Sequence, residues 1–356
     1  MTGEIEIPRT YFRCRDCGYT DLPFDRILEI EVLAHRMTKK FMMEVAFFGQ
    51  NQNSFKDASN MIKRTMNMDI SKETIRNVAE AIGKQIHHAD EMKAQHTIEN
   101  ISEIEIFDNP KKETLYIMID GAAVNTRVQD ENGSTWRENK TVMVFTDKNM
   151  IKKKNGSHII VAKEYMALIG TAEEFKKFVL DASVRAGYGK VENVVIIADG
   201  ATWIRNLCNE IFPDSIQILD FYHLKENIYG YAKYLFKDDQ TKYVPWAEEV
   251  IDNIVSGHVE QACSLIPHLN TKLPASVVNL RTYIDNNLDR INYPDYKNRG
   301  FFVGSGAIES ANKVIVHRRL KQSGMRWSVE GAQSILTLRS KVESDLWDKE
   351  SNIFCA

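Results

Sequence analysis

The sequence predicts a mixed α/β fold in which helices cover a central sheet. Two short apolar segments each run into Asp-Gly, at Asp120 and Asp199, as expected for buried strands that finish at one edge of a sheet. Amphipathic helical segments alternate with the later strands. Three successive strands followed by helix–strand–helix–strand describe a mixed sheet, with antiparallel neighbours first and parallel crossovers afterwards.

Length and composition allow two or three domains. The 356 residues are 43% hydrophobic and 27% charged, and no run of about 18 apolar residues occurs. The start, Met-Thr-Gly-Glu-Ile-Glu, lacks the apolar region of a signal peptide. Five cysteines, sparse and odd in number, suit reduced thiols. We therefore expect a cytoplasmic protein with no membrane partner.

Residues 1–24 contain half of a zinc-ribbon motif. Cys14 and Cys17, followed by Gly18, have the spacing of one metal-binding knuckle. A structural zinc normally takes four ligands, but no second cysteine pair lies nearby and the first histidine is His35. The pair is either part of an incomplete Zn²⁺ site or two reduced thiols in a turn.

Residues 25–110 have a helical pattern. A helix with Phe55 and Ile62 on one face precedes a second helix, which Ser71 can cap. Two helices joined by a brief turn fit a helix-turn-helix, whose second helix would enter the major groove of DNA. A packing or interaction module is the alternative.

Residues 111–232 carry the expected sheet and its first helices. A lysine-containing loop after Ile151 suits a hairpin turn before the third strand. Amphipathic helices are expected from Thr171 and again over residues 201–211. This order of elements is that of the ribonuclease-H-like fold. The expected strands are residues 114–119, 140–146, 158–162, 194–198 and 216–219.

Residues 233–299 interrupt this pattern and predict a helical insertion. The segment is rich in helical sequence, with Pro245, Pro267 and Pro274 as expected breaks. Residues 300–356 then return to the core with a helix that carries Glu309, which Ser305 can cap.

Asp120, Asp199 and Glu309 are the candidate catalytic and metal-binding residues. Two strand ends and a facing helix would bring these carboxylates together, and their mutual repulsion favours binding of divalent cations such as Mg²⁺ or Mn²⁺. Two such ions about 3.5–4 Å apart serve phosphoryl transfer. A single strand ending in Asp-Gly is more often just a strand and a turn, but two in a compatible order with a helical glutamate are a stronger signal.

Several nearby residues have two possible roles. Asp220 ends the fifth expected strand and His223 starts the next helix, where the pair would bind metal or substrate, or simply each other. Trp203 and Trp136 suit stacking on a base, although a core position is commoner for a tryptophan.

A basic segment follows Glu309 directly. Between Ser310 and Val329 there are five cationic and no acidic residues, although the formal net charge of the chain is −3. We expect this segment to contact DNA phosphates, with Arg127 as a weaker candidate; a solvated helix face is the alternative. The five residues are Lys313, Arg318, Arg319, Lys321 and Arg326.

Taken together, these residues resemble the DDE transposases of bacterial insertion sequences, most closely those of the ISLre type, and more distantly the Mutator-like transposases. The likeness covers most of the chain. Its most distinctive segment runs from Gly304-Ser-Gly-Ala-Ile-Glu to Gly-Met-Arg-Trp327. The other matching segments are Cys14–Gly18 with Leu22-Pro-Phe-Asp, Ile119-Asp-Gly, Trp136-Arg-Glu, Ala198-Asp-Gly-Ala-Thr-Trp and Asp220-Phe-Tyr-His.

The resemblance implies that Asp120, Asp199 and Glu309 form the DDE triad and that residues 233–299 are the helical insertion of the family. It implies that Asp220 and His223 form an accessory Asp-x-x-His element. One departure is that only a single cysteine knuckle precedes the helical region.

The function that the resemblance implies is cutting and joining of double-stranded DNA, at inverted repeats and at a target. It implies a homo-oligomer on DNA, associated with the nucleoid. The alternatives are a relative that binds DNA without cutting it and a nuclease of the same fold that lacks strand transfer.

Overall fold

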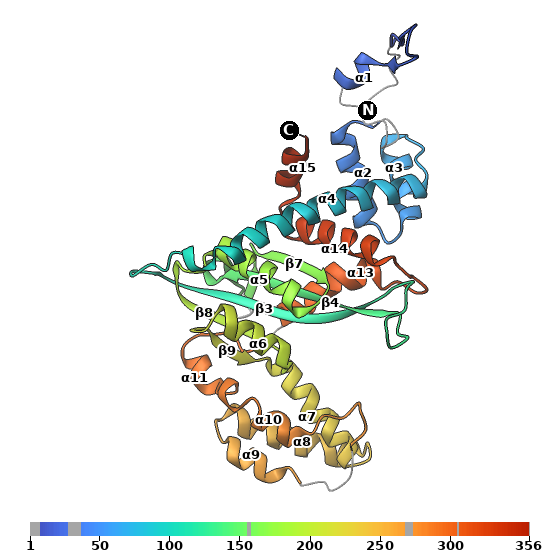
Figure 1. The fold of residues 1–356 in the computed structure, drawn as a ribbon. Helices are drawn as coiled ribbons and strands as arrows, with labels where there is room; N and C mark the ends of the chain where they lie inside the picture. Colours follow the sequence, from blue (N-terminus) through green and yellow to red (C-terminus); the bar gives the residue numbers. More distant parts are fainter. Residues whose placement is uncertain (1–7, 28–36, 155–157, 268–272, 305, 356) are drawn as a thin grey trace.

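The computed structural model describes residues 8–27, 37–154, 158–267, 273–304 and 306–355. Its centre is a five-stranded mixed sheet with the order β7-β4-β3-β8-β9 (Figure 1). The N-terminal helices and the helices of residues 221–298 lie at opposite ends of the molecule (Figure 1). The expected mixed α/β class is confirmed.

The first three strands of the sheet are antiparallel and the last two are parallel additions. β3 (Lys111–Asn125) pairs with β4 (Trp136–Thr146), and β4 pairs with β7 (Glu164–Ile169), both antiparallel. β8 (Val191–Ala198) runs parallel to β3, and β9 (Ile216–Leu219) runs parallel to β8.

Alternating side chains give the sheet two apolar faces. Leu115, Ile117 and Ile119 of β3 pack with α5 (Ala172–Ala186) and α6 (Thr202–Ile211). Tyr116 and Met118 point the other way and join a larger core. That core includes α12 (Gly306–Asn312) and α14 (Val329–Glu343). The period-2 pattern of the strands therefore places helices on both faces.

The third core strand differs from the expectation. Within residues 158–162, β6 (His158–Ile160) pairs only with β5 (Met150–Lys152), as a small separate hairpin. The sheet instead uses β7, whose four central residues are buried, whereas His158 and Ile159 are exposed. The hairpin itself was expected here, although residues 155–157 of its loop lie outside the described residues.

β3 also continues beyond the expected end at Asp120. Asp120 pairs with Thr141 and Gly121 with Lys140, and the pairing with β4 runs on to Asn125. The parallel partner β8 stops at Ala198, opposite Ile119. Asp120 therefore lies where β8 ends, although its own strand continues in a two-stranded ribbon.

The N-terminal region begins with a short hairpin and continues as helices. Ser54 and Ser71 cap α3 and α4 by accepting hydrogen bonds from main-chain N–H groups three residues on. At 28 residues, α4 is far longer than the short second helix expected of a helix-turn-helix. The elements are β1 (Phe12–Arg13), β2 (Thr20–Asp21), α1 (Pro23–Ile27), α2 (Lys39–Asn51), α3 (Phe55–Met66) and α4 (Lys72–Glu99).

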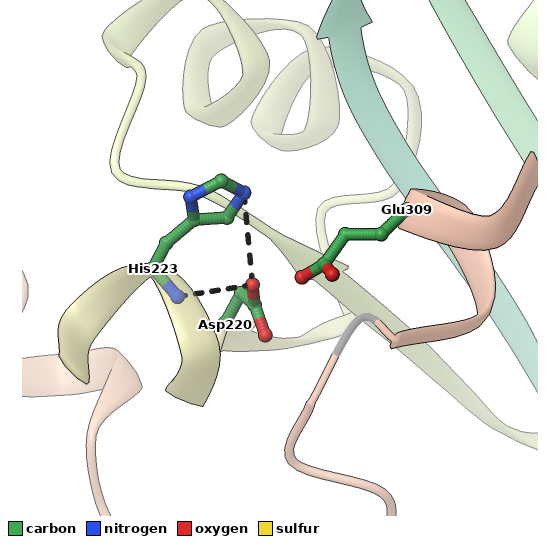
Figure 2. A group of neighbouring side chains, drawn as sticks. All are labelled: Asp220, His223 and Glu309. Atoms are coloured by element: carbon green, nitrogen blue, oxygen red, sulfur yellow. Dashed lines mark hydrogen bonds and ion pairs between the residues drawn. The ribbon is translucent and has the colours of Figure 1, made fainter. Parts of the chain in front are cut away.

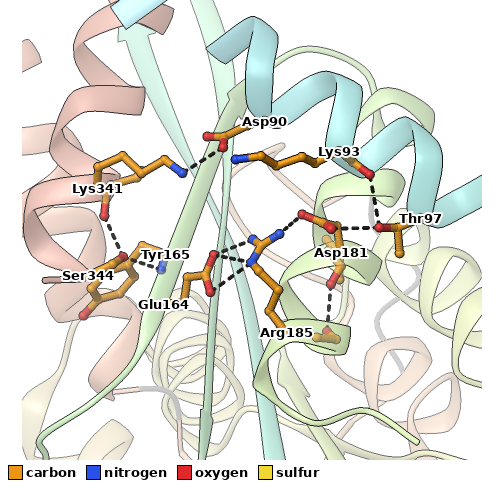
Figure 3. A network of polar contacts seen from close by, with 12 residues as sticks. Asp90, Lys93, Thr97, Glu164, Tyr165, Asp181, Arg185, Lys341 and Ser344 are labelled. Carbon is orange, nitrogen blue, oxygen red and sulfur yellow. Dashed lines mark hydrogen bonds and ion pairs between the residues drawn. The ribbon is translucent and has the colours of Figure 1, made fainter. Parts of the chain in front are cut away.

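Helix α4 joins the N-terminal region to the core (Figures 1 and 3). It crosses α14 so closely that a Cβ atom at Gly83 would lie 2.5 Å from the carbonyl oxygen of Ser334. Asp90 of α4 accepts a hydrogen bond from Lys341 of α14 at 2.8 Å. Thr97, near the end of α4, donates to Asp181 of α5 at 2.8 Å. Helices from both faces of the sheet therefore form hydrogen bonds with α4.

The region expected to be an insertion is helical. Pro245 lies inside α8 rather than at a break, so the helix continues despite one missing main-chain donor. No helix in the described part of the chain is both long and apolar enough to cross a membrane. α7 (Phe221–Leu235) runs into this region from the core. The helices within it are α8 (Gln240–Val255), α9 (Val259–Leu265), α10 (Leu280–Asp285) and α11 (Tyr293–Asn298).

Candidate active site

Asp120 and Asp199 line the same pocket, as the sequence predicts. Asp199 directly follows β8, next to the point where Ala198 pairs with Ile119. The pocket has a volume of about 290 Å³, and Glu138 and Trp203 also line it. Asp199 accepts a hydrogen bond from the Ala201 N–H group at 2.9 Å. Two carboxylates from adjacent parallel strands therefore face one cavity.

The carboxylate of Asp120 is held from two sides. Its Oδ1 accepts from the Gly121 N–H group at 2.7 Å, and its Oδ2 accepts from Nδ2 of Asn312 at 2.6 Å. Burial raises the pKa of Asp120, and the negative charge of Asp199 adds to the effect; the two hydrogen bonds and His223 oppose it. A cation in the pocket would favour the charged form of this carboxyl group.

Glu309 lies in a second group, with Asp220 and His223 (Figure 2). One potential ligand atom from each of these residues lies within 4.8 Å of the others. Among the described residues, this is the one set of three histidine, cysteine or acidic side chains with metal-binding spacing. Asp220 caps α7 by accepting from the N–H groups of Tyr222 and His223, both at 3.2 Å.

The imidazole of His223 lies between two acidic groups. Its Nε2 is 3.7 Å from Asp220 and its Nδ1 is 3.5 Å from Glu226. The two accessory residues therefore lie close to each other and to Glu309.

Two contacts connect these groups. Asn312 follows Glu309 by three residues on α12, and residues at this spacing share one helix face. Its amide binds Asp120, while the charge of His223 influences the pKa of Asp120. The expected triad is thus divided between two adjoining groups, with Asp120 and Asp199 in one and Glu309 in the other. Ser305, the expected cap of α12, lies outside the described residues.

Lys140 and Glu138 add charges that the sequence pattern did not reveal. The ammonium group of Lys140 donates to Glu138 at 2.7 Å and to the Gly170 carbonyl oxygen at 2.8 Å. It also lies 5.2 Å from the centre of the Trp203 ring. Trp203 is half-buried at the pocket wall. Glu138 and Lys140 occupy alternate positions of β4 and therefore lie on one face of the sheet. This spacing in the sequence could have indicated that the two charges lie together.

The helices of residues 233–299 reach this site through Tyr283 of α10. A Cβ atom at Gly200 would lie 2.5 Å from the Tyr283 ring, so the ring fills the space next to this glycine. Burial raises the pKa of Tyr283 to about 12, and the nearby charges of Asp199 and Asp220 contribute. The glycine after Asp199 therefore admits a side chain from the neighbouring helices.

The basic segment is only partly exposed. It continues from α12 through a π-helical turn (Lys313–His317) into α13 (Arg318–Leu320). Four of its five cationic residues are exposed, namely Lys313, Arg318, Lys321 and Arg326. Trp136 is exposed as well, with the Lys321 ammonium group 5.9 Å from its ring centre.

Arg319 corrects the expectation of five surface phosphate contacts. It is 1% exposed, and its guanidinium lies 4.4 Å from the ring centre of Phe55 and 5.0 Å from that of Trp327. It donates to the carbonyl oxygens of Gly49 and Asn53. Neighbouring helical residues point about 100° apart, so Arg319 faces the N-terminal helices while Arg318 faces solvent.

Cys14 and Cys17 lie exposed in the β1–β2 hairpin with free thiols. Hydrogen bonds from the N–H groups of Cys17 and Asp16 lower the pKa of Cys14, which favours the thiolate that metals bind. No further ligand comes within metal-binding distance among the described residues, and His35 lies outside them. Zinc binding by this pair stays a prediction.

The fold and the site define a mixed α/β protein with a carboxylate-rich site at one edge of its sheet. The chain belongs to the Uncharacterised protein family (UPF0236), whose model matches residues 1–349. No curated protein matches the chain. The family covers nearly the whole chain, and its description assigns no activity.

Proposed function

We propose that the chain is a DDE-type DNA transposase with a ribonuclease-H-like catalytic core. The observation that carries the proposal is the shared pocket of Asp120 and Asp199, to which Asn312 ties the helix of Glu309. The order of three antiparallel strands followed by two parallel strands supports this core. The reaction would be cleavage of insertion-sequence ends and their joining to target DNA.

The donor atoms fit hard divalent cations. Asp120, Asp199 and Glu309 offer carboxylate oxygens, the ligand type that Mg²⁺ and Mn²⁺ prefer, and Asp220 and His223 extend the set. The pKa of Asp120 is raised because burial and the negative charge of Asp199 destabilise its carboxylate form. A bound cation would stabilise that carboxylate form and so lower the pKa. Such ions would supply an activated water or hydroxyl and charge neutralisation at phosphorus.

The chain's own residues would position DNA around this chemistry. Asn312 fixes the orientation of Asp120, and Lys140 provides a positive charge beside the pocket. The exposed Lys313, Arg318 and Lys321 would contact phosphates on the continuation of the Glu309 helix. Joining two ends of an element requires an oligomer on DNA. The proposal also places the protein in the cytoplasm, at the nucleoid.

The test is strand cleavage and joining on duplexes that carry the DNA flanking the gene, with Mg²⁺ or Mn²⁺. Asp199→Asn should lower cleavage at least about 100-fold, because it removes a charged ligand of the cations that would neutralise the reacting phosphate. Glu192→Gln, which changes an exposed acid on β8, the strand that Asp199 follows, should leave cleavage unchanged. Equal cleavage by the wild type and Asp199→Asn would contradict the proposed site.

The products of the same assay distinguish related activities. Nicked ends without joined products would identify a nuclease that lacks strand transfer. Negligible cleavage by both proteins, with DNA binding retained, would identify a DNA-binding relative.

A further inference from the structure

A second pocket, of about 450 Å³, lies between the N-terminal helices and the segment that precedes α14. Four arginines and one glutamate line it: Arg76, Arg127, Arg319, Arg326 and Glu80. We call it the arginine pocket. None of the residues that line the pocket of Asp120 and Asp199 contributes to it.

The far end of β3 and the segment around Trp327 form one wall of the arginine pocket. The Trp327 N–H group donates to Asn125 at 3.1 Å, and the Arg127 N–H group donates back to Trp327 at 2.8 Å. Nε of Arg127 donates to the carbonyl oxygen of Arg326 at 3.3 Å. These hydrogen bonds hold the two main chains together, so the backbone positions that carry the side chains of Arg127 and Arg326 are fixed relative to each other.

The floor of the pocket carries a buried positive charge. Burial, with the nearby charge of Arg339, lowers the pKa of Arg319 to about 10, so it remains protonated at neutral pH. Its Nη2 is buried without a hydrogen-bond partner among the described residues. Phe55 and Trp327 stack against its guanidinium. An anion above this floor would meet an attractive field that water screens only weakly.

Glu80 offsets this charge only in part. Burial raises the pKa of Glu80, while the charges of Arg76 and Arg127 oppose that rise. One carboxylate among four guanidinium groups leaves the lining with an excess of positive charge. Guanidinium groups present paired N–H donors that match the oxygens of a phosphate.

The position of the pocket indicates the source of the phosphate. Asp120 and Arg127 are seven residues apart, and β3 extends to Asn125, so the two positions lie at most roughly 23 Å apart at about 3.3 Å per residue. Duplex DNA covers that length in about seven base pairs. A duplex with its reacting phosphate at Asp120 can therefore present another phosphate to the arginine pocket.

We propose that the arginine pocket binds a backbone phosphate of duplex DNA, about seven base pairs from the phosphate at the acidic site. The inference rests on the proposed function for the position of the DNA. It assigns Arg76, Arg127 and Arg326 as the contacting residues. It also gives the N-terminal helices a sequence-independent share in DNA binding through Arg76, near the start of α4.

The test is fluorescence anisotropy with a labelled duplex of about 30 base pairs, measured over a series of salt concentrations. Arg127→Gln/Arg326→Gln should weaken binding about tenfold and lower the slope of log affinity against log salt by about one, because one phosphate contact is lost. Arg76→Gln should act in the same direction. The control Lys242→Gln/Lys297→Gln removes two positive charges from exposed positions in α8 and α11 and should change neither quantity.

Thermal unfolding by circular dichroism checks that each variant is folded, and Arg76→Gln serves if the double variant is not. Unchanged affinity and slope in the pocket variants overturn the inference, as does an equal loss in the lysine control. Failure of the wild type to bind the duplex also overturns it. The cleavage comparison with Asp199→Asn reports on the proposed function independently of these outcomes.

Discussion

Asp120 and Asn312 form the contact on which the candidate site depends most. The Asn312 amide donates to Asp120, but its own Oδ1 is buried and finds no partner among the described residues. Burying a carboxylate and leaving an amide oxygen without a donor both cost stability. The site therefore holds two locally unfavourable groups, a pattern common where function rather than stability sets the residue.

Asp120→Asn should stabilise the metal-free protein while it abolishes activity. The native pKa of Asp120 lies above the unfolded value, so its contribution to stability is greatest at low pH and declines as pH rises through the native pKa. The amide introduced at position 120 can also donate a hydrogen bond to Oδ1 of Asn312 when the Asn312 side-chain amide is flipped. The midpoint of thermal unfolding in EDTA should rise, on the order of 2–4 °C, at pH 7 and change little at pH 4.

Divalent cations should reverse the difference in unfolding midpoint between the wild type and Asp120→Asn. Mg²⁺ or Mn²⁺ should raise the unfolding midpoint of the wild type, because a ligand that binds only the folded state stabilises it. Asp120→Asn should respond less. A wild type that is insensitive to both ions at millimolar concentration would argue against a cation site at Asp120.

Individual roles were predictable only where the local pattern was sufficient. Asp199 follows its strand as expected, and Ser71 caps α4 as its position predicts. Arg319 and its neighbour Arg318 look equivalent in sequence, but only tertiary packing decides which of them is buried. Asn312 carries no charge and resembles any helical asparagine until the helix is placed against β3.

At the scale of elements, α4 crosses α14 closely at Gly83. Glycine allows the crossing, because a Cβ atom at this position would lie 2.5 Å from the carbonyl oxygen of Ser334. Gly230 in α7 differs, since an added Cβ atom there would meet nothing within 4 Å. Gly83 therefore tests the helix crossing, and Gly230 provides the matched control.

Gly83→Ala should destabilise the protein by about 1–3 kcal/mol, because the helices must separate to admit a methyl group. Gly230→Ala should stabilise it by up to about 1 kcal/mol through the higher helix propensity of alanine. Urea unfolding monitored by circular dichroism measures both. The same sign of change in the two variants would contradict the close crossing of α4 and α14 at Gly83.

Strand boundaries were less predictable than helices for a physical reason. A helix is specified by local spacing and capping, so the start of α4 follows from Ser71. A strand needs a distant partner, and β7 rather than residues 158–162 pairs with β4 because its side chains can be buried. For the same reason, the extension of β3 past Asp120 depends on β4 and was not visible in the β3 sequence.

At the scale of the whole molecule, Lys341 connects three parts of the chain. Its ammonium lies 2.8 Å from Asp90 of α4, as Figure 3 shows. It also lies 2.9 Å from Glu350 of α15 (Trp347–Cys355). Burial opposes the charged form, but the two carboxylates outweigh it, so the pKa of Lys341 lies above its ordinary value. All three side chains are buried.

Lys341→Met should cost about 3–5 kcal/mol of stability, because two carboxylates would remain buried without a cation. Lys349→Met changes an exposed lysine on the same segment and should cost less than about 0.5 kcal/mol. Equal unfolding midpoints for the two variants would show that the buried network contributes little.

The overall arrangement was predictable as a class, but its closest contacts were not. Strand order and helical segments indicate a mixed sheet with helices on both faces, as observed. The sequence does not show that Tyr283 approaches Asp199, or that Arg76 and Arg326 line one pocket. These contacts join residues 84 or more positions apart, for which a single sequence contains no local signal.

The placement of α14 between α4 and β7 has a consequence for synthesis on the ribosome. The end of α4 can dock on α5 early, through Thr97 and Asp181. The part around Gly83 must wait for α14, which is translated roughly 240 residues later, or about 12–50 s at 5–20 residues per second. During that interval the part of α4 that α14 will cover is exposed in the nascent chain, so this part of the helix is where we expect a chaperone to bind.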